Sequence, residues 1–299
     1  MKVFITGGTG FIGLPLIRHL LAHNHTITAL SRTPSSANTL LSLGCHPHQG
    51  TLTDLPALRA AASSADAVLH LAMIHDFHNL DESFAIDRAA ITAMAEALEG
   101  TGKPLIITSD TMVLSYGKLG IETDNDFEPG TTLAGRAESE PLLKKLTEEL
   151  GIRGGIVRLA PVVHGEGDRA YTGMLVDLAR KNNAAVYVGN GSQRWAAVHK
   201  EDAVEVFRLA MEKGRPGAVY HAVAEEGVTL KDLSETIAKH VGVAAESQTR
   251  EKAEKSLGFM AEYVDADSPA SGDLTRNELG WTPKQPGLLA DINANYFTT

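Results

Sequence analysis

Glycines recur at every third position in a short segment near the amino terminus, between two apolar stretches. The segment Thr6-Gly7-Gly8-Thr9-Gly10-Phe11-Ile12-Gly13 has the spacing G-x-x-G-x-x-G. The first glycine permits a tight turn, the second lets backbone approach a pyrophosphate, and the third lets a helix pack closely on a strand. A helix that begins here directs its first N–H groups at the phosphates, so the spacing predicts a dinucleotide site. The expected contacts in this segment are Gly7, Thr9, Gly10, Phe11, Ile12 and Gly13.

The residues after this turn bear on which dinucleotide binds. An NAD site has a carboxylate about 20 residues beyond the glycines, which binds the ribose 2′-hydroxyl. No Asp or Glu occurs between Gly13 and Thr53, and the second apolar stretch ends in Ser31-Arg32. A hydroxyl followed by a guanidinium suits a 2′-phosphate through charge-assisted hydrogen bonds. The sequence therefore predicts NADP, with a solvated loop charge as the alternative interpretation of Arg32.

Side chains that could exchange a proton follow three later apolar stretches. Tyr116 is the only phenol in its loop, and a cationic nicotinamide together with Lys118 would lower its pKa toward the working pH. We therefore expect Tyr116→Phe to reduce turnover by roughly 10²-fold or more without weakening NADP(H) binding. Each neighbouring candidate also has a structural interpretation: the side chain caps the backbone of its own loop, or the histidine is buried with its hydrogen bonds satisfied. The catalytic candidates are Tyr116, Asp110, Thr111, His75 and Asp76, with His78 and His164 nearby.

The hydrophobic pattern predicts the fold that positions these groups. Apolar runs of strand length alternate with helix-period segments up to about residue 165, which predicts an α/β fold of the Rossmann type: a doubly wound parallel sheet. The expected strands are Lys2-Thr6, Thr26-Ser31, Ala67-Ala72, Leu105-Ser109, Gly155-Leu159 and Ala218-Ala222. The expected helices are Phe11-His23, Leu55-Ala62, Phe84-Glu99, Ser139-Leu150, His199-Met211, Leu230-His240 and Arg250-Leu257.

Beyond residue 165 the alternation loosens, which predicts two lobes. Residues 1–165, with about 198–222 returning to the sheet, form the expected NADP-binding domain. About 166–197 and 223–299 form a smaller, carboxyl-terminal substrate lobe. A crevice between the lobes is the expected binding site.

Composition limits the partners. The net charge of −10 gives no overall positive field for nucleic acid or an anionic membrane, and no apolar run reaches the ~18 residues of a membrane span. The single Cys45 and the absence of a secretory pattern at the amino terminus predict a cytoplasmic protein without disulfides. No metal site is expected, because no carboxylate accompanies the histidines in sequence. Those histidines, expected on a solvated surface, are His19, His23, His25, His46 and His48.

Several segments after the glycine turn match, in order, segments of a known protein family. The chain resembles the extended and atypical short-chain dehydrogenases/reductases, which include NAD(P)-dependent epimerases and dehydratases. The matching segments are Gly50-Thr51-Leu52-Thr53-Asp54-Leu55, His70-Leu71-Ala72, Arg158-Leu159-Ala160-Pro161-Val162-Val163-His164-Gly165, Val198-His199-Lys200-Glu201-Asp202-Ala203 and Leu279-Gly280-Trp281-Thr282-Pro283. The resemblance implies further cofactor contacts at Thr51, Leu52, Leu71, Ala72, Thr108, Ser109, Arg136 and Pro161.

The catalytic residues that the resemblance implies are altered here. The family pairs a tyrosine with a lysine four residues later, and none of the six tyrosines has that partner. Alignment places Thr132 at the tyrosine position, Arg136 at the lysine position and Asp110 at the position of an upstream serine. Asp87 takes the place of an asparagine on the fourth helix. The active site is therefore expected to be degenerate.

The function that follows is an NADP(H)-dependent oxidoreductase of the atypical short-chain type, acting on a small carbonyl or alcohol between the lobes. An NADP-binding epimerase, dehydratase or non-redox isomerase is the alternative enzyme. A non-catalytic NADP(H) sensor that contacts a protein partner is the third possibility. The expected assembly is a monomer or homodimer.

Overall fold

The computed structural model describes residues 1–74, 76, 79–131 and 133–296. The sequence also assigns roles to His75, His78 and Thr132, and these three residues are not among those described. Within the described chain, no helix has the length and apolar character needed to span a membrane.

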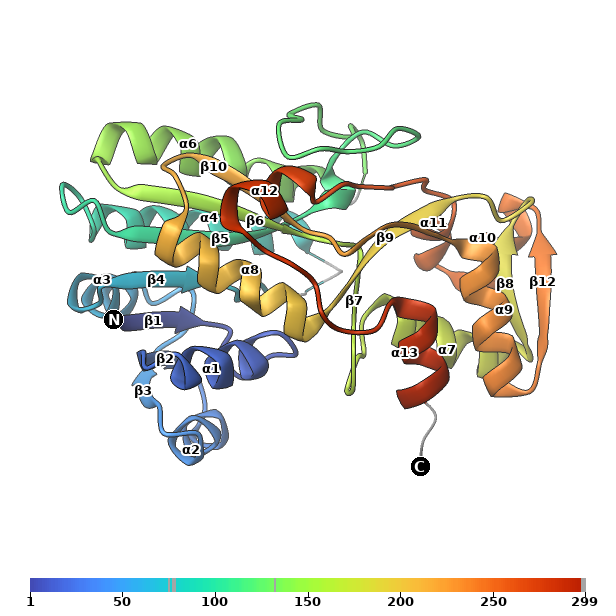
Figure 1. Ribbon diagram of the computed structural model, residues 1–299, viewed down its shortest axis with the longest axis horizontal. Helices are drawn as coiled ribbons and strands as arrows, with labels where there is room; N and C mark the ends of the chain where they lie inside the picture. Colours follow the sequence, from blue (N-terminus) through green and yellow to red (C-terminus); the bar gives the residue numbers. More distant parts are fainter. Residues whose placement is uncertain (75, 77–78, 132, 297–299) are drawn as a thin grey trace.

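A seven-stranded parallel sheet forms the centre of the larger lobe (Figure 1). Its strands lie in the order β10-β6-β5-β4-β1-β2-β3, so the chain moves outward from β1 in both directions. The strands are β1 (Lys2–Thr6), β2 (Thr26–Ser31), β3 (His46–Gln49), β4 (Ala67–His70), β5 (Pro104–Asp110), β6 (Arg153–Leu159) and β10 (Ala218–Ala222). The order reverses between β1 and β4, which is where open α/β sheets bind ligands.

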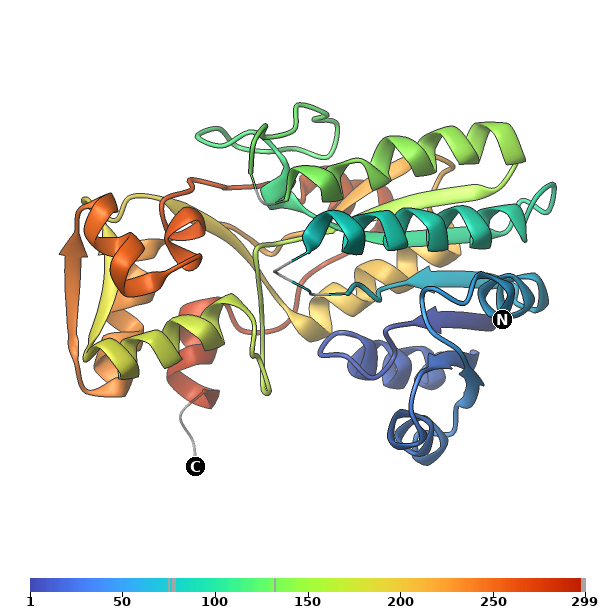
Figure 2. The ribbon, with the colours of Figure 1, turned by 180° about the vertical axis from the view of Figure 1, so that it is seen from behind.

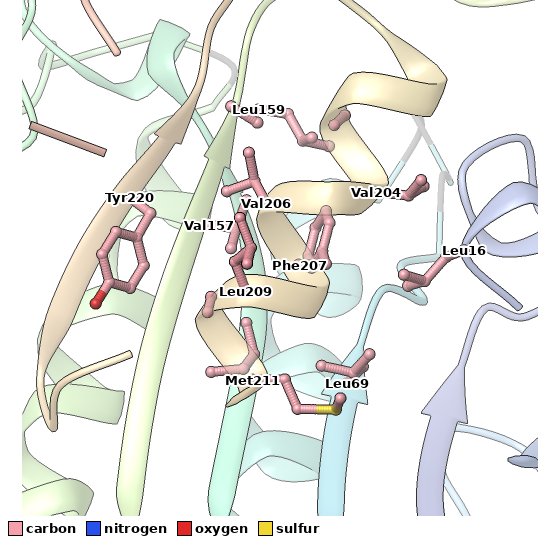
Figure 3. Packing of buried hydrophobic residues seen from close by; sticks show 14 of the residues in the cluster. Leu16, Leu69, Val157, Leu159, Val204, Val206, Phe207, Leu209, Met211 and Tyr220 are labelled. Carbon is pink, nitrogen blue, oxygen red and sulfur yellow. The ribbon is translucent and has the colours of Figure 1, made fainter. Parts of the chain in front are cut away.

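Helices cover both faces of this sheet. The helices α1 (Gly13–Ala22) and α8 (Lys200–Lys213) pack on one face, while α3 (Leu55–Ser64), α4 (Leu80–Glu96) and α6 (Ser139–Leu150) pack on the other (Figure 2). Figure 3 shows Phe207 and Val206 of α8 directed at the sheet beside Val157 and Leu69. The two cores confirm the doubly wound α/β fold.

The smaller lobe, at the other end of the molecule in Figure 1, has its own apolar core, which includes the buried Trp195. Its strands are β7 (Val162–His164), β9 (Arg194–His199) and β11 (Glu225–Thr229) in one sheet, and β8 (Ala184–Val188) with β12 (Ala244–Gln248) in another. Its helices are α7 (Tyr171–Asn182), α9 (Leu230–Val241), α10 (Arg250–Leu257), α11 (Met260–Val264) and α13 (Leu288–Asn295).

Several elements differ from the pattern-based expectations or are additional to them. The helix α2 (Pro34–Ser42) and the edge strand β3 are additional elements. Both are short and largely polar, so the hydrophobic pattern does not predict them. The helix α12 (Asp273–Leu279) packs against α8 and β10. Trp281, which follows α12, is buried in the same core, so part of the segment expected in the smaller lobe belongs to the larger one.

Candidate functional site

A cavity of about 390 Å³ lies between the two lobes, at the carboxyl ends of the strands around the reversal point. The larger lobe contributes the glycine turn, the ends of β5 and β6 and the short helix α5 (Ala134–Ala137). The smaller lobe contributes α7 and α11. The lining residues are Gly7, Gly10, Phe11, Ile12, Gly13, Leu71, Met73, Leu80, Thr108, Ser109, Asp110, Leu133, Arg136, Leu159, Ala160, Pro161, Val163, Ala170, Tyr171, Met174 and Tyr263.

The glycine turn has the geometry that each of its glycines requires. Gly7 has φ of 74°, and a Cβ there would lie 2.7 Å from the backbone nitrogen of Ala72. A Cβ on Gly13 would lie 2.1 Å from the Gly7 carbonyl oxygen, so only glycine lets α1 approach the strand. A Cβ on Gly10 would lie 3.2 Å from the same Gly7 oxygen, with no other neighbour within 4 Å in the described part of the chain, and the remaining space opens into the cavity.

The amino terminus of α1 suits an anion. No side chain among the described residues caps this helix, and its first turn carries no acidic residue. The Leu14 N–H already donates to the Gly10 carbonyl oxygen at 3.0 Å, and Pro15 has no N–H. Phosphate oxygens would therefore bind the N–H groups at the very start of the helix, around Ile12 and Gly13, where the helix dipole also favours negative charge. The open space at Gly10 and the uncapped helix together fit the pyrophosphate of a dinucleotide.

The expected cofactor contacts divide into two sets. Those in the cavity wall are Gly7, Gly10, Phe11, Ile12, Gly13, Leu71, Thr108, Ser109, Arg136 and Pro161. Those outside it are Thr9, Ser31, Arg32, Thr51, Leu52 and Ala72. The second set includes the residues expected at the adenosine end, so the cavity covers the pyrophosphate and nicotinamide end of the expected site.

Ser31 does not have the exposed hydroxyl that the sequence suggests. Its side chain is buried, and Oγ donates to the Thr33 carbonyl oxygen at 3.1 Å and bonds Ser36 Oγ at 2.8 Å. These bonds fix the start of α2, where Thr33 and Ser36 form a capping box. Arg32 is exposed at the end of β2, so it alone of the pair is accessible to a phosphate.

Asp110 ends β5 and lies in the cavity wall. Its Oδ1 accepts a hydrogen bond of 2.7 Å from the Met112 backbone N–H, which begins a 3-10 turn over Thr111–Val113. Burial raises the pKa of Asp110 to about 6, against the opposing effects of that N–H and the positive charge of Arg136. A carboxyl group that titrates near neutral pH in a cleft can both donate and accept a proton.

Arg136 lies opposite this carboxyl at the end of α5. Its Nη2 donates to the Thr108 carbonyl oxygen at 2.8 Å, and Nη1 lies 2.5 Å from the Met73 sulfur. A guanidinium stays protonated, so Arg136 provides positive charge and hydrogen bonds and does not exchange protons.

A buried network supports the glycine turn from behind. His70 bonds Thr6 Oγ1 through Nδ1 at 2.7 Å and Asp87 Oδ1 through Nε2 at 3.0 Å. Ser139 Oγ donates to the other oxygen of Asp87 at 2.9 Å. Burial acts to raise the pKa of Asp87, but the His70 and Ser139 bonds and the charges of His70 and Arg136 outweigh it, so this pKa is lowered. Asp87 thus tethers α4 to β4 and α6.

Ser109 belongs to a second buried network. Its hydroxyl donates to Glu140 Oε1 at 2.6 Å, and Arg158 forms two hydrogen bonds, of 2.9 and 2.6 Å, with the same carboxylate. The sequence predicted Ser109 as a cofactor contact, and its hydroxyl is engaged with Glu140. These bonds hold the end of β5, and therefore Asp110, in one position.

Tyr116 differs from the sequence-based expectation. Burial raises its pKa, and the negative charge of Asp110 adds to the effect, so the expected lowering of its pKa is wrong. The hydroxyl has no hydrogen-bond partner among the described residues, and Tyr116 is not in the cavity wall. Lys118, the expected activating cation, forms an exposed ion pair with Asp126 at 3.3 Å.

Two other tyrosines, which the sequence interpretation did not select, line the cavity from the smaller lobe. The rings of Tyr171 and Tyr263 lie 5.2 Å apart, and Tyr171 also contacts Trp195 at 5.6 Å between centroids. Burial and the charge of Asp110 raise the pKa of Tyr171 well above its ordinary value. Neither residue belongs to a recognisable motif, since 92 positions separate them, so only the fold brings them together.

The remaining candidates lie outside the cavity wall. Thr111 is buried, and its hydroxyl has no partner in the described part of the chain. Asp76 is exposed. His164 is buried in β7, where Nδ1 lies 2.7 Å from Asp291 Oδ2, so it is a satisfied core histidine.

The expectation that the amino-terminal histidines are solvated and have no carboxylate beside them is also wrong. His19 Nε2 lies 2.7 Å from Glu205 and His25 Nε2 lies 3.0 Å from Glu212, both on α8. His25 is moreover buried rather than solvated. His19 and His25 are therefore each bonded to a carboxylate more than 180 residues away in the sequence.

Comparison with known proteins shows what the chain is similar to. The sequence model of the NAD dependent epimerase/dehydratase family matches residues 3–242. The uncharacterized protein YLL056C of Saccharomyces cerevisiae is 40% identical over 99% of this chain and 99% of its own length. A 4-hydroxy-2-methyl-3-oxo-4-farnesyl-3,4-dihydroquinoline-1-oxide ketoreductase of Stigmatella aurantiaca is 26% identical over 82% of this chain and 75% of its own.

Solved structures share the fold. The UDP-glucose 4-epimerase of Thermus thermophilus, in complex with NAD, superposes with a TM-score of 0.75 at 19% identity, covering 99% of this chain and all of the epimerase chain.

Proposed function

The chain belongs to the NAD dependent epimerase/dehydratase family, and on this premise we propose that it is an NADP(H)-dependent oxidoreductase acting on a small, largely apolar carbonyl compound or alcohol. The observation that carries the proposal is the position of Asp110. Its carboxyl group faces the same cavity as the glycine turn, and its pKa is raised to about 6. The cavity thus joins a pyrophosphate cradle to a group able to exchange a proton.

The glycine turn and the amino terminus of α1 would hold the pyrophosphate, and Arg136 and Pro161 would flank the nicotinamide. The bound dinucleotide supplies a hydride donor or acceptor. Arg32, exposed at the end of β2 with no acidic residue between Gly13 and Thr53, would bind a 2′-phosphate. These features support NADP over NAD.

Asp110 would move the proton at the substrate oxygen. The Met112 N–H engages its Oδ1, which leaves Oδ2 as the oxygen that carries the proton. In carbonyl reduction the protonated carboxyl donates to the developing alkoxide, and in alcohol oxidation the carboxylate accepts the hydroxyl proton. This role replaces the tyrosine that the sequence lacks.

The substrate wall is mostly apolar. Leu133, Met174 and Tyr171 line the cavity beside Tyr263, and none of them offers a charged group to a substrate. Such a wall favours a compact hydrophobic molecule with one carbonyl, since apolar surface contributes most of the binding free energy.

The test is turnover on a panel of small aldehydes and ketones with NADPH, followed by absorbance at 340 nm and by product analysis. Net NADPH consumption matched by alcohol formation supports the proposal. Product without net consumption would replace the proposed oxidoreductase with an epimerase, dehydratase or isomerase, in keeping with the family's description. Binding of NADPH without any chemistry would favour a sensor.

A further inference from the structure

Three side chains with metal-binding atoms meet on the surface between α1 and α8, away from the cavity. His19 lies in the last turn of α1, His23 directly follows that helix, and Glu205 lies on α8. One ligand atom from each lies within 4.8 Å of those of the other two. The helices lie side by side in Figure 1, and the site is at the opposite end of α1 from the glycine turn.

The imidazole of His23 is oriented as that of a metal ligand is. His23 Nδ1 lies 2.8 Å from the His19 carbonyl oxygen. A carbonyl oxygen only accepts, so Nδ1 carries the hydrogen and Nε2 keeps its lone pair. Metal-binding histidines commonly donate their second ring N–H to a backbone carbonyl, which fixes both tautomer and ring orientation.

Glu205 is already positioned beside His19. Its Oε2 lies 2.7 Å from His19 Nε2, and the two atoms share one proton. Arg208 fixes the carboxylate, because its Nε donates to Oε2 at 2.7 Å and its Nη2 donates to Oε1 at 2.6 Å. Because a carboxylate oxygen has two lone-pair positions, Arg208 leaves one on Oε2 for His19 or for a metal ion that displaces the shared proton.

The surrounding charge favours a cation. Glu205 and Glu212 bear two negative charges against the one positive charge of Arg208, which also bonds Glu212 Oε2 at 2.6 Å. The carbonyl end of α1 adds a partial negative charge. The site is open to solvent, because the side chains of His19 and Glu205 are 25% and 29% exposed, so water can complete the coordination.

We propose that His19, His23 and Glu205 bind one Zn²⁺ ion, with water in the fourth position. Two imidazole nitrogens and one carboxylate oxygen are a ligand set suited to zinc, whereas Mg²⁺ and Ca²⁺ prefer oxygen ligands alone. The ion links the carboxyl end of α1 to α8, two helices that pack on the same face of the sheet.

The experiment is calorimetric titration of the tag-free chain with zinc chloride in a buffer that does not bind metals. We expect one ion per chain and an upward shift in Tm with zinc. His23→Ala, at an exposed position, should weaken zinc binding by roughly tenfold or more and remove the shift. Glu205→Gln should act in the same way.

Matched controls change the same residue types elsewhere. His46→Ala removes an exposed histidine on β3, and Glu201→Gln removes an exposed carboxylate one turn earlier on α8. Both should bind zinc as the unsubstituted chain does. Unchanged binding in His23→Ala, or loss of binding in His46→Ala, would overturn the assignment. If Glu205→Gln fails to fold, His23→Ala alone decides the question.

Discussion

Replacing Asp110 with asparagine tests the proposed proton-transfer group, because the change removes the ionisable group and keeps its shape. The asparagine side-chain oxygen can still accept the Met112 N–H bond that begins the 3-10 turn. With a pKa of about 6, Asp110 is protonated in acid and ionised above neutral pH. Carbonyl reduction should therefore slow as the pH rises through about 6, and alcohol oxidation should accelerate over the same range.

Asp110→Asn should lower turnover by roughly 10²- to 10⁴-fold and flatten both pH profiles, as loss of a general acid does. NADPH binding should be unchanged. The assay is initial rate against pH in both directions, with cofactor affinity measured separately. The matched control is Asp126→Asn, at a side chain that is 81% exposed in the following loop, and it should keep the profile of the unsubstituted chain.

The same carboxyl group makes an independent prediction about stability. Its folded pKa of about 6 lies above its ordinary value of 3.8, so the folded state binds more protons between these values and stability falls as the pH rises through them. The difference corresponds to roughly 3 kcal/mol above neutral pH. Asp110→Asn should therefore raise the free energy of unfolding at pH of about 8 by up to that amount, and by much less near about pH 4.

Denaturant unfolding at the two pH values measures this difference. Equal stability changes at both would refute the raised pKa, and unaltered turnover in Asp110→Asn would refute the proton-transfer role.

The other predictions concern the cofactor and Tyr116. Arg32→Ala should reduce the preference for NADPH over NADH by about 1.5–3 kcal/mol in paired titrations, the cost of a lost charged hydrogen bond. Equal affinity of the unsubstituted chain for both cofactors would contradict the NADP assignment. Gly10→Val should abolish cofactor binding with little change in circular dichroism, since its side chain fills space that opens into the cavity. Tyr116→Phe should keep turnover within about threefold and be neutral or slightly stabilising, because the lost hydroxyl is buried without a partner among the described residues. A hundredfold loss would restore Tyr116 as the proton donor.

Much of the fold follows from local sequence patterns. The bounds of β1, β2, β10, α6 and α10 are those that the sequence pattern predicts. The strands and α6 bury runs or stripes of apolar residues, and α10 buries Ala253 and Leu257, which lie four positions apart on one face. The glycine turn is partly local. The positive φ of Gly7 and the contact of Gly13 with the Gly7 carbonyl oxygen arise within the turn, whereas the close approach of Gly7 to the Ala72 backbone depends on the pairing of β1 with β4. The hydrophobic pattern is weak in α2 and β3, and it does not predict these two elements.

Sequence by itself thus determined the α/β fold, the glycine turn and the absence of the tyrosine–lysine pair. Tertiary structure decided what those features do together. The pKa values of Asp110 and Tyr116 depend on burial, which chain order does not encode locally, and so the choice of proton donor changed. Likewise Glu205 reaches His19 across 186 residues because α1 and α8 pack on one face of the sheet, and such contacts arise only when the chain folds.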